Sequence, residues 1–300
     1  MLERLRIVLV RPIRSGNVGA VCRAMTNFGL SDLVLVAPRC DYLDAQGTGF
    51  AARALPRLEA ARVVESIPDA LADCVHTFAT SAKGGFYRRN AAIGAAEGAR
   101  LAVDATAAGP VAVAFGPEDR GLVLDDLLHF DRVIEIPTAP QYPALNLAAA
   151  VTILAYELFL ASPTAAPAPG SPVQGAPANN APAHDAPALG APARTTPAES
   201  APGARAKSAR AYDARAAGAQ KRVMFERLFG SLERIGFFRN QQYENHLRLG
   251  IRHMLGRLDL SANEADILLG IARQIAWYAD QPASAARTAD PDQTDRARAP

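Results

Sequence analysis

Five short apolar runs, separated by segments of helical pattern, constrain the fold of this chain more than any other feature. Most of them are nearly continuous in Val, Leu, Ile, Ala and Phe. They lie at residues 6–10, 33–38, 75–80, 111–116 and 132–137. Near-continuous apolar strands that alternate with helices are typical of a parallel sheet covered on both faces. The sequence therefore predicts an α/β fold over residues 1–160, with ligands expected where the strands end.

The stretch that follows the first run predicts a helix from about Asn17 to Gly29. On a 3.6-residue period its larger apolar side chains share one face, and four other residues collect on the opposite edge. These four are Gly19, Arg23, Thr26 and Asn27. Gly19 and Arg23 have two interpretations: a close-packing glycine beside a solvent-facing arginine, or two residues that face a ligand at the end of the first strand.

A proline at every fifth position, from Pro167 to Pro202, divides the chain. Between the prolines stand Ala, Gly and small polar residues, so this tract lacks the large apolar side chains that a core requires. Residues 161–206 are therefore expected to form a disordered linker. Its prolines favour extended polyproline II structure, which is able to hold the flanking domains far apart.

Helical periodicity returns over residues 207–280, and the acidic, basic and Pro-containing tail at 281–300 is expected to be disordered. Ser261 and Glu264 form a capping-box pattern before the last helix. Residues 204–257 contain 12 Lys or Arg and 4 Asp or Glu, which is a local excess of +8. This basic helical module suits the phosphate backbone of a nucleic acid. The alternative is a set of helices whose charged outer faces are simply solvated.

Several classes of protein are disfavoured by what the sequence lacks. No secretory signal is visible at the start, so a cytoplasmic location is expected, and no apolar stretch is long enough to span a membrane. The three cysteines match no metal or redox spacing and are expected to be buried free thiols: Cys22, Cys40 and Cys74. His246 and His253 lie seven residues apart without a third ligand and are expected at the surface, so no metal site is predicted.

Three further stretches lie where predicted strands end: "ATSAKGG" at 79–85, "FGPEDRGL" at 115–122 and "EIPTAPQYPALNL" from 135 onward. Glycine and small residues at such ends let backbone groups approach a ligand closely. The dinucleotide fingerprint is absent, because "SGNVGAV" does not satisfy G-x-G-x-x-G and no acidic residue ends the second strand. A nicotinamide-dependent oxidoreductase is therefore disfavoured.

Taken together, the four stretches resemble the three signature motifs of the SpoU branch of the SPOUT superfamily of RNA methyltransferases. The matching residues are Asn17, Gly19, Arg23, Phe28 and Gly29 in the first motif; Gly116, Pro117, Glu118, Gly121 and Leu122 in the second; and Leu145, Asn146, Ala150 and Val151 in the third. The third motif departs from the family's usual Ser-Leu-Asn, because this chain has Ala144-Leu145-Asn146. Any hydrogen bond from that serine hydroxyl is therefore lost, while main-chain contacts remain possible.

The resemblance implies a catalytic domain whose parallel sheet ends in a C-terminal trefoil knot, formed after the fourth strand, and which works as a homodimer. It also implies that S-adenosylmethionine binds in the knot, mainly through main-chain groups. The residues that the resemblance places at this cofactor are Thr80, Ser81, Ala82, Gly116, Ile136, Ala144, Leu145 and Asn146.

The resemblance further implies catalytic roles for Arg23, Asn17, Glu118 and Asn146. Arg23 corresponds to the family's catalytic arginine, and a guanidinium that stays protonated favours a clamp on phosphate and on the developing 2′-alkoxide over a general base. Asn17 is expected to orient the same group, and Gly19 to leave room for RNA. Glu118 has an alternative role as a carboxylate at a helix N-terminus, and Asn146 as the cap of the following helix.

Within this branch, the first and third motifs and the separate helical C-terminal part look most like enzymes that methylate the ribose of the pyrimidine at position 32 of tRNA. The expected partners are therefore tRNA and a second copy of the chain. The alternatives are the same chemistry on ribosomal RNA or on another tRNA nucleotide, and a non-catalytic RNA-binding paralogue. Retention of Asn17, Arg23, Glu118 and Asn146 argues against the paralogue.

Overall fold

The computed structural model describes residues 1–81, 92–163, 214–238 and 241–280. Residues 1–163, here called the sheet domain, form these elements in chain order: η1 (Leu2–Arg4), β1 (Leu5–Val10), α1 (Ser15–Asn27), β2 (Asp32–Val36), α2 (Ala45–Ala51), η2 (Ala52–Ala54), α3 (Leu55–Glu59), β3 (Arg62–Val64), α4 (Ile67–Leu71), β4 (His76–Thr80), β5 (Ala92–Gly94), α5 (Ala95–Ala105), β6 (Val111–Phe115), α6 (Leu124–Leu127), β7 (Arg132–Glu135) and α7 (Leu147–Ala161). Residues 214–280, here called the helical module, form α9 (Gly218–Arg234), α10 (Gln241–Gly256) and α11 (Ala262–Ala279). None of the helices in these described ranges is both long and apolar enough to cross a membrane.

The seven strands form one parallel sheet in the order β3-β2-β1-β6-β4-β7-β5. β1 lies between β2 and β6, and all six of its residues are buried. This explains why its sequence shows no alternation of polar and apolar residues: both faces of the strand meet helices. The predicted parallel α/β sheet with flanking helices is confirmed.

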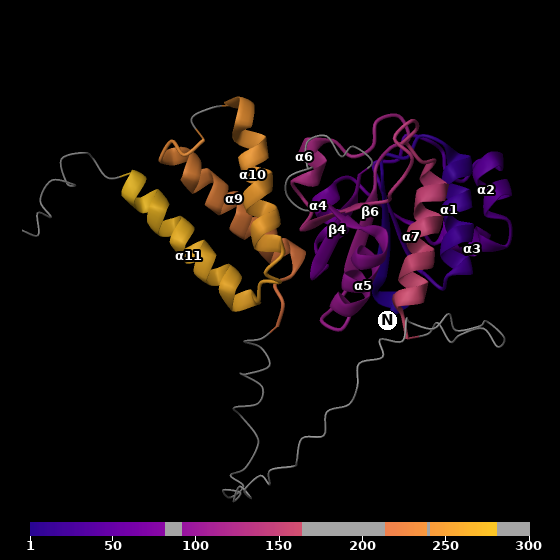
Figure 1. Cartoon of the computed structure of the whole chain (residues 1–300), viewed down its shortest axis with the longest axis horizontal. Coiled ribbons are helices and arrows are strands. Elements are labelled where there is room, and N and C mark those ends of the chain that lie inside the picture. Colours follow the sequence, from indigo (N-terminus) through magenta and orange to yellow (C-terminus); the bar gives the residue numbers. More distant parts are fainter. Residues whose placement is uncertain (82–91, 164–213, 239–240, 281–300) are drawn as a thin grey trace, which may run out of the picture.

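The two faces of the sheet are covered differently. α1, α5 and α7 pack on one face and enclose a core around Leu9, Met25 and Leu154. The second face is covered by α4 and α6, which have five and four residues, and by Leu249 from α10 of the helical module. In Figure 1 the module accordingly lies beside α4 and α6, on the side of the sheet away from α1 and α7.

The five predicted strands are present, and two three-residue strands were not predicted. β3 falls inside the segment around 45–65 that was expected to be helical, and two of its residues are exposed. β5 is equally short, has no buried residue and extends the sheet beyond β7. Strands of three residues with mixed burial produce no clear period in a sequence, which is why both were missed.

The helical module packs directly against the sheet domain, so the wide separation that the proline-rich sequence would allow is not present between these two parts. Two glycines mark the contact, because a Cβ on Gly218 would lie 2.1 Å from the Leu71 carbonyl oxygen and one on Gly256 would lie 2.8 Å from the Cα of Asp131. The Ser261–Glu264 capping box is confirmed. The Pro-rich tract from 164 on and the tail at 281–300 lie outside the described residues.

Candidate functional site

A cavity of about 340 Å³ lies where β4, β6 and β7 end, and we call it the strand-end cavity. Its volume lies within the range of about 300–1,000 Å³ that is usual for small-molecule sites. Six of the residues assigned to the cofactor by the sequence resemblance line it: Thr80, Ser81, Gly116, Ile136, Ala144 and Leu145. Asn146 adjoins it in sequence, and Ala82 lies outside the described residues.

The wall of the cavity formed by residues 116–122 is a tightly folded turn. The Gly121 N–H donates to the Pro117 carbonyl at 2.9 Å, and Gly121 has a φ of +70°, a left-handed conformation that favours glycine. A Cβ on Gly116 would lie 2.2 Å from the Leu122 amide nitrogen. Arg120 and Pro143 also line the cavity without having been predicted. Each lies within two residues of a motif position, and that proximity was the feature of the sequence that could have identified it.

Asn17, Glu118 and Asn146, which come from three separate motifs, form one hydrogen-bonded group that we call the amide–carboxylate cluster. The Asn17 Nδ2 donates to Glu118 Oε1 at 2.8 Å, and the Asn146 Nδ2 donates to Asn17 Oδ1 at 3.0 Å. Both functional atoms of the Asn17 amide are therefore engaged. The cluster fixes the start of α1, the turn after β6 and the start of α7 relative to one another.

Glu118 and Asn146 also fill the structural roles that the sequence left open for them, a carboxylate near a helix N-terminus and a helix cap. Glu118 accepts the backbone N–H groups of Ile13 and Arg14, just before α1, at 2.9 and 3.2 Å. Asn146 caps α7, since its Oδ1 accepts from the amides of Ala148 and Ala149. The capping bond uses the oxygen of Asn146 and the cluster bond uses its nitrogen, so one role does not exclude the other.

Arg23 and Gly19 lie apart from the strand-end cavity within this chain. Arg23 is exposed on α1 and, six residues beyond Asn17, points about a third of a turn away around the helix axis. Gly19 is buried against α2, where an added Cβ would lie 2.1 Å from the Gly47 carbonyl oxygen. The expectation that Gly19 keeps space for RNA is replaced by the close-packing interpretation: the glycine lets α1 and α2 touch.

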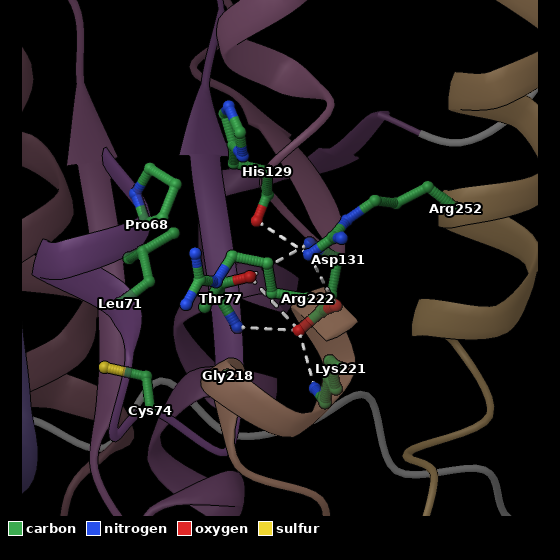
Figure 2. A pocket seen from close by; sticks show the side chains of 10 residues that line it. All are labelled: Pro68, Leu71, Cys74, Thr77, His129, Asp131, Gly218, Lys221, Arg222 and Arg252. Carbon is green, nitrogen blue, oxygen red and sulfur yellow. Dashed lines mark hydrogen bonds and ion pairs between the residues drawn. The ribbon is translucent and has the colours of Figure 1, made fainter. Parts of the chain in front are cut away.

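A second polar group, which sequence reasoning missed, lies between the sheet domain and the helical module. Figure 2 shows the Asp131 carboxylate between Thr77 and Lys221, with Arg252 approaching from α10. The Lys221 Nζ lies 2.9 Å from Asp131 Oδ2 and also donates to the Val75 carbonyl at 2.7 Å. The Arg252 guanidinium donates to the His129 carbonyl at 2.8 Å. We call Asp131, Lys221 and Arg252 the docking cluster.

Every charged side chain of the docking cluster is buried: those of Asp131, Lys221 and Arg252 are 1%, 4% and 10% exposed. Burial on its own raises the pKa of Asp131, but the surrounding cations, Lys221 first among them, outweigh it and hold that pKa well below the usual range. Lys221 lies 90 residues from Asp131 in sequence, so no local motif joins them. The geometry of this cluster is that of a domain contact, and its charges are paired within the chain.

The docking cluster changes how the positive charge of the module is interpreted. Lys221 and Arg252 face the sheet domain rather than solvent. Arg248 pairs with Glu233 and with Glu244, and Arg215 pairs with Asp259 at 3.0 Å. Three of the 12 basic residues, Lys221, Arg252 and Arg215, are therefore paired with carboxylates from outside residues 204–257, so part of the local excess of +8 is neutralised within the protein.

The burial of the described cysteine and histidine side chains matches the sequence prediction only in part. Cys22 and Cys74 are buried free thiols whose pKa burial raises to about 12, whereas Cys40 is only half-buried, contrary to expectation. His253 is buried, not at the surface as predicted. Among the residues whose positions are described, no three His, Cys, Asp or Glu side chains are placed to hold a metal ion.

Comparison with known sequences gives a consistent picture. Residues 4–156 match the family described as the SpoU rRNA Methylase family. The chain is 39% identical over 164 residues to the tRNA (cytidine/uridine/adenosine-2'-O-)-methyltransferase TrmJ of Pseudomonas aeruginosa, a match that covers 54% of this chain and 62% of that protein. It is 40% identical over 161 residues to the tRNA (cytidine/uridine-2'-O-)-methyltransferase TrmJ of Pectobacterium atrosepticum, covering 54% and 66%. The chain thus spans just under two thirds of the length of these relatives.

Solved structures extend the similarity beyond residue 156. TrmJ from Z. mobilis ZM4 superposes with a TM-score of 0.63 and 26% identity, covering 90% of this chain and 98% of that one. A probable methylase family protein from Haemophilus influenzae Rd KW20 superposes with a TM-score of 0.51 and 28% identity, covering 93% and 99%. The similarity to these two structures therefore covers most of this chain and is not limited to the residues that the family model matches.

Proposed function

Because this chain belongs to the SpoU rRNA Methylase family, we propose that it transfers a methyl group from S-adenosylmethionine to a ribose 2′-hydroxyl of tRNA. The observation that carries the proposal is the strand-end cavity, lined by residues of the three loops that follow β4, β6 and β7, beside the amide–carboxylate cluster. The named activities of the TrmJ relatives support tRNA ribose as the substrate class.

The residues of the strand-end cavity fit the proposed methyl donor. The cavity has the volume of a small-molecule site, and its folded 116–122 turn leaves no room for a Cβ at Gly116. Thr80, Ser81, Ile136 and residues 144–145 would hold the donor together with that turn. When bound, S-adenosylmethionine supplies an electrophilic methyl group on a positively charged sulfur.

The chain's own groups have to position the ribose and to stabilise its oxygen as the hydroxyl proton leaves. Arg23 is proposed to bind the adjacent phosphate and the developing negative charge on the 2′-oxygen, because a guanidinium remains protonated. Asn17, held on both sides by Glu118 and Asn146, is proposed to orient the same ribose. Asn146 bonds Asn17 and also caps α7, so it connects the proposed ribose-binding side of the site to the start of that helix.

A homodimer is proposed because Arg23 and the strand-end cavity lie apart in one chain. A second copy would bring its Arg23 to the cavity of the first and complete the site. α7 supports this arrangement, since Ile153, Tyr156 and Leu160 are 37%, 49% and 50% exposed on its outer surface. These apolar side chains follow a helical spacing and form a face that a second copy would cover.

A trefoil knot is proposed for the segment after β6. β7 lies between β4 and β5, two strands that are consecutive in the chain, so the segment leaving Glu135 starts between two strands that the chain joins directly. That connection includes residues 82–91, which lie outside the described range. The buried return of α7 against α1 and α5 is consistent with a threaded chain.

Within tRNA, the pyrimidine at position 32 of the anticodon loop is the proposed target, and the cytoplasm the proposed place of action. The test is to map 2′-O-methylation in tRNA from cells that lack the gene and from cells that express the Arg23→Ala variant in its place. We expect loss of methylation at position 32 in both strains and its return with the wild-type gene. Loss at a different nucleotide would redirect the proposal, and unchanged methylation throughout would overturn it.

A further inference from the structure

A groove of about 290 Å³ runs between α9 and α11 on the outer side of the helical module, separate from the strand-end cavity and from the docking cluster. α9 and α11 lie side by side, and the Ser231 hydroxyl of α9 donates to the Ala272 carbonyl oxygen of α11 at 2.7 Å. Gly230, Ala272 and Ala276 keep the groove open, because none of them has a side chain larger than a methyl group.

Three arginines line this groove: Arg227 and Arg234 from α9 and Arg273 from α11. All three are exposed, whereas Lys221, Arg248 and Arg252 of the same module are drawn into internal pairs. Arg234 contacts Asp280 at 2.8 Å, and Glu226 is the one carboxylate on the described lining. Arg222 and Arg257 of the module are also exposed outside this lining, and the groove brings three exposed arginines of the module together.

An exposed aromatic side chain continues the groove. Trp277 follows Arg273 by one turn of α11, so the two side chains lie on the same side of the helix, and Trp277 is 54% exposed. Guanidinium groups bind phosphate oxygens through paired N–H donors, and an exposed indole offers a surface on which an unpaired base stacks. This combination is typical of surfaces that follow single-stranded nucleic acid.

We propose that the groove between α9 and α11 binds the sugar–phosphate backbone of tRNA, with Arg227 and Arg273 contacting phosphates. The ligand class rests on the proposed function, and the inference goes further by assigning the contact to one groove of the module. Because the docking cluster fixes the module on the sheet domain, the groove holds the RNA at a set position relative to the strand-end cavity.

The experiment measures binding of an unmodified tRNA transcript to the full-length chain over a series of salt concentrations. Arg227→Gln combined with Arg273→Gln should weaken binding about tenfold and reduce the slope of log K against log salt by about 1.4 to 1.8, since each phosphate contact contributes about 0.7 to 0.9. The matched control is Arg62→Gln combined with Arg100→Gln, which removes two exposed charges from the sheet domain and should leave the slope unchanged.

A second variant fills the groove without removing charge. No heavy atom lies within 4 Å of a Cβ built on Gly230, so Gly230→Leu is sterically acceptable and replaces a weak helix former with a strong one. We expect this variant to keep its fold, to bind S-adenosylmethionine as the wild type does, and to bind tRNA at least threefold more weakly.

Each outcome separates this inference from the proposed function. Wild-type affinity and salt slope in the double arginine variant, with methyl transfer intact, would overturn the groove assignment and leave the proposed function standing. Weakening by Gly230→Leu alone, with an unchanged salt slope in the arginine variant, would also overturn it, because Arg227 and Arg273 would then make no phosphate contact. A wild-type chain that neither binds nor methylates tRNA would overturn both.

Discussion

Glu118 and Asp131 are carboxylates held by hydrogen bonds at opposite ends of the same sheet, but their surroundings differ. Glu118 is half-buried beside the strand-end cavity and accepts from neutral donors, namely the Asn17 amide and two backbone N–H groups. Asp131 is fully buried before β7 and faces the cations Lys221 and Arg252. A half-buried cluster on the lining of a cavity can be reached by a ligand, whereas a buried cluster of opposite charges holds two parts of the chain together.

The comparison predicts that changes on the cavity side reduce turnover and that changes on the docking side reduce stability. Arg23→Ala should give the largest effect, a loss of methyl transfer of about 10²- to 10³-fold or more, because it removes the charge that stabilises the developing oxyanion. Since Arg23 is exposed, the free energy of unfolding should change by less than about 0.5 kcal/mol. Turnover with a tRNA transcript and urea denaturation measure the two quantities.

Affinity for S-adenosylmethionine, measured by isothermal titration, is the control for this variant, and it should stay within a few-fold of the wild-type value. A large drop in that affinity would place Arg23 at the donor instead of at the RNA. Persistent turnover would remove the arginine from the reaction altogether.

Lys221→Met tests the opposite side of the comparison. It leaves the Asp131 carboxylate buried and without its nearest cation, so the free energy of unfolding should fall by about 3–5 kcal/mol. The matched control is Arg100→Met, which breaks an exposed pair with Asp104 and should cost less than about 0.5 kcal/mol. Equal losses in the two variants, measured by urea denaturation, would mean that the docking cluster is not buried in solution.

The residues of the amide–carboxylate cluster could be predicted from the sequence because they lie in short motifs that follow strands. Asn17, Glu118 and Asn146 each stand within a few residues of a recognisable strand end or helix start, and parallel strands bring such ends to one edge. The helical period likewise predicted the buried face of α1. It did not distinguish the packing role of Gly19 from a role toward RNA, since both require a small residue and only the position of α2 decides between them.

The docking cluster could not be predicted from the sequence in this way. Lys221 and Arg252 belong to segments rich in basic residues, and a sequence gives the net charge of a segment without showing which charges turn inward. Their partner Asp131 lies 90 residues or more away, beyond the reach of any periodic pattern. The same limit concealed Leu249, whose burial depends on α10 meeting the second face of the sheet.

Leu249→Ala should show how much of the sheet's second face the module stabilises. Leu249 is 4% exposed in the core with Leu127 and Phe130, so its truncation should cost about 2–4 kcal/mol. Leu247, two residues earlier on α10, is 45% exposed, and Leu247→Ala should cost less than about 1 kcal/mol. Urea denaturation of both variants provides the measurement. Similar losses would show that α10 does not contact the sheet domain as described.

The smallest expected effect is a weakening of the docked module in mild acid. Burial first, and then the positive charge of Arg252, lower the pKa of His253 to about 4 from its usual 6.5. The folded pKa lies below the unfolded one, so the unfolded chain takes up the proton first and stability is lost as the pH falls from about 6.5 toward 4. Between pH 7 and 5.5 this single group should cost about 1 kcal/mol. The lowered pKa of Asp131 acts in a more acidic range, below about pH 4, and does not contribute in this window.

Urea midpoints at the two pH values should therefore differ less in His253→Gln than in the wild type. Identical pH dependence in the two proteins would show that His253 is already solvated, and that the face of α10 docked on the sheet domain is not closed as described.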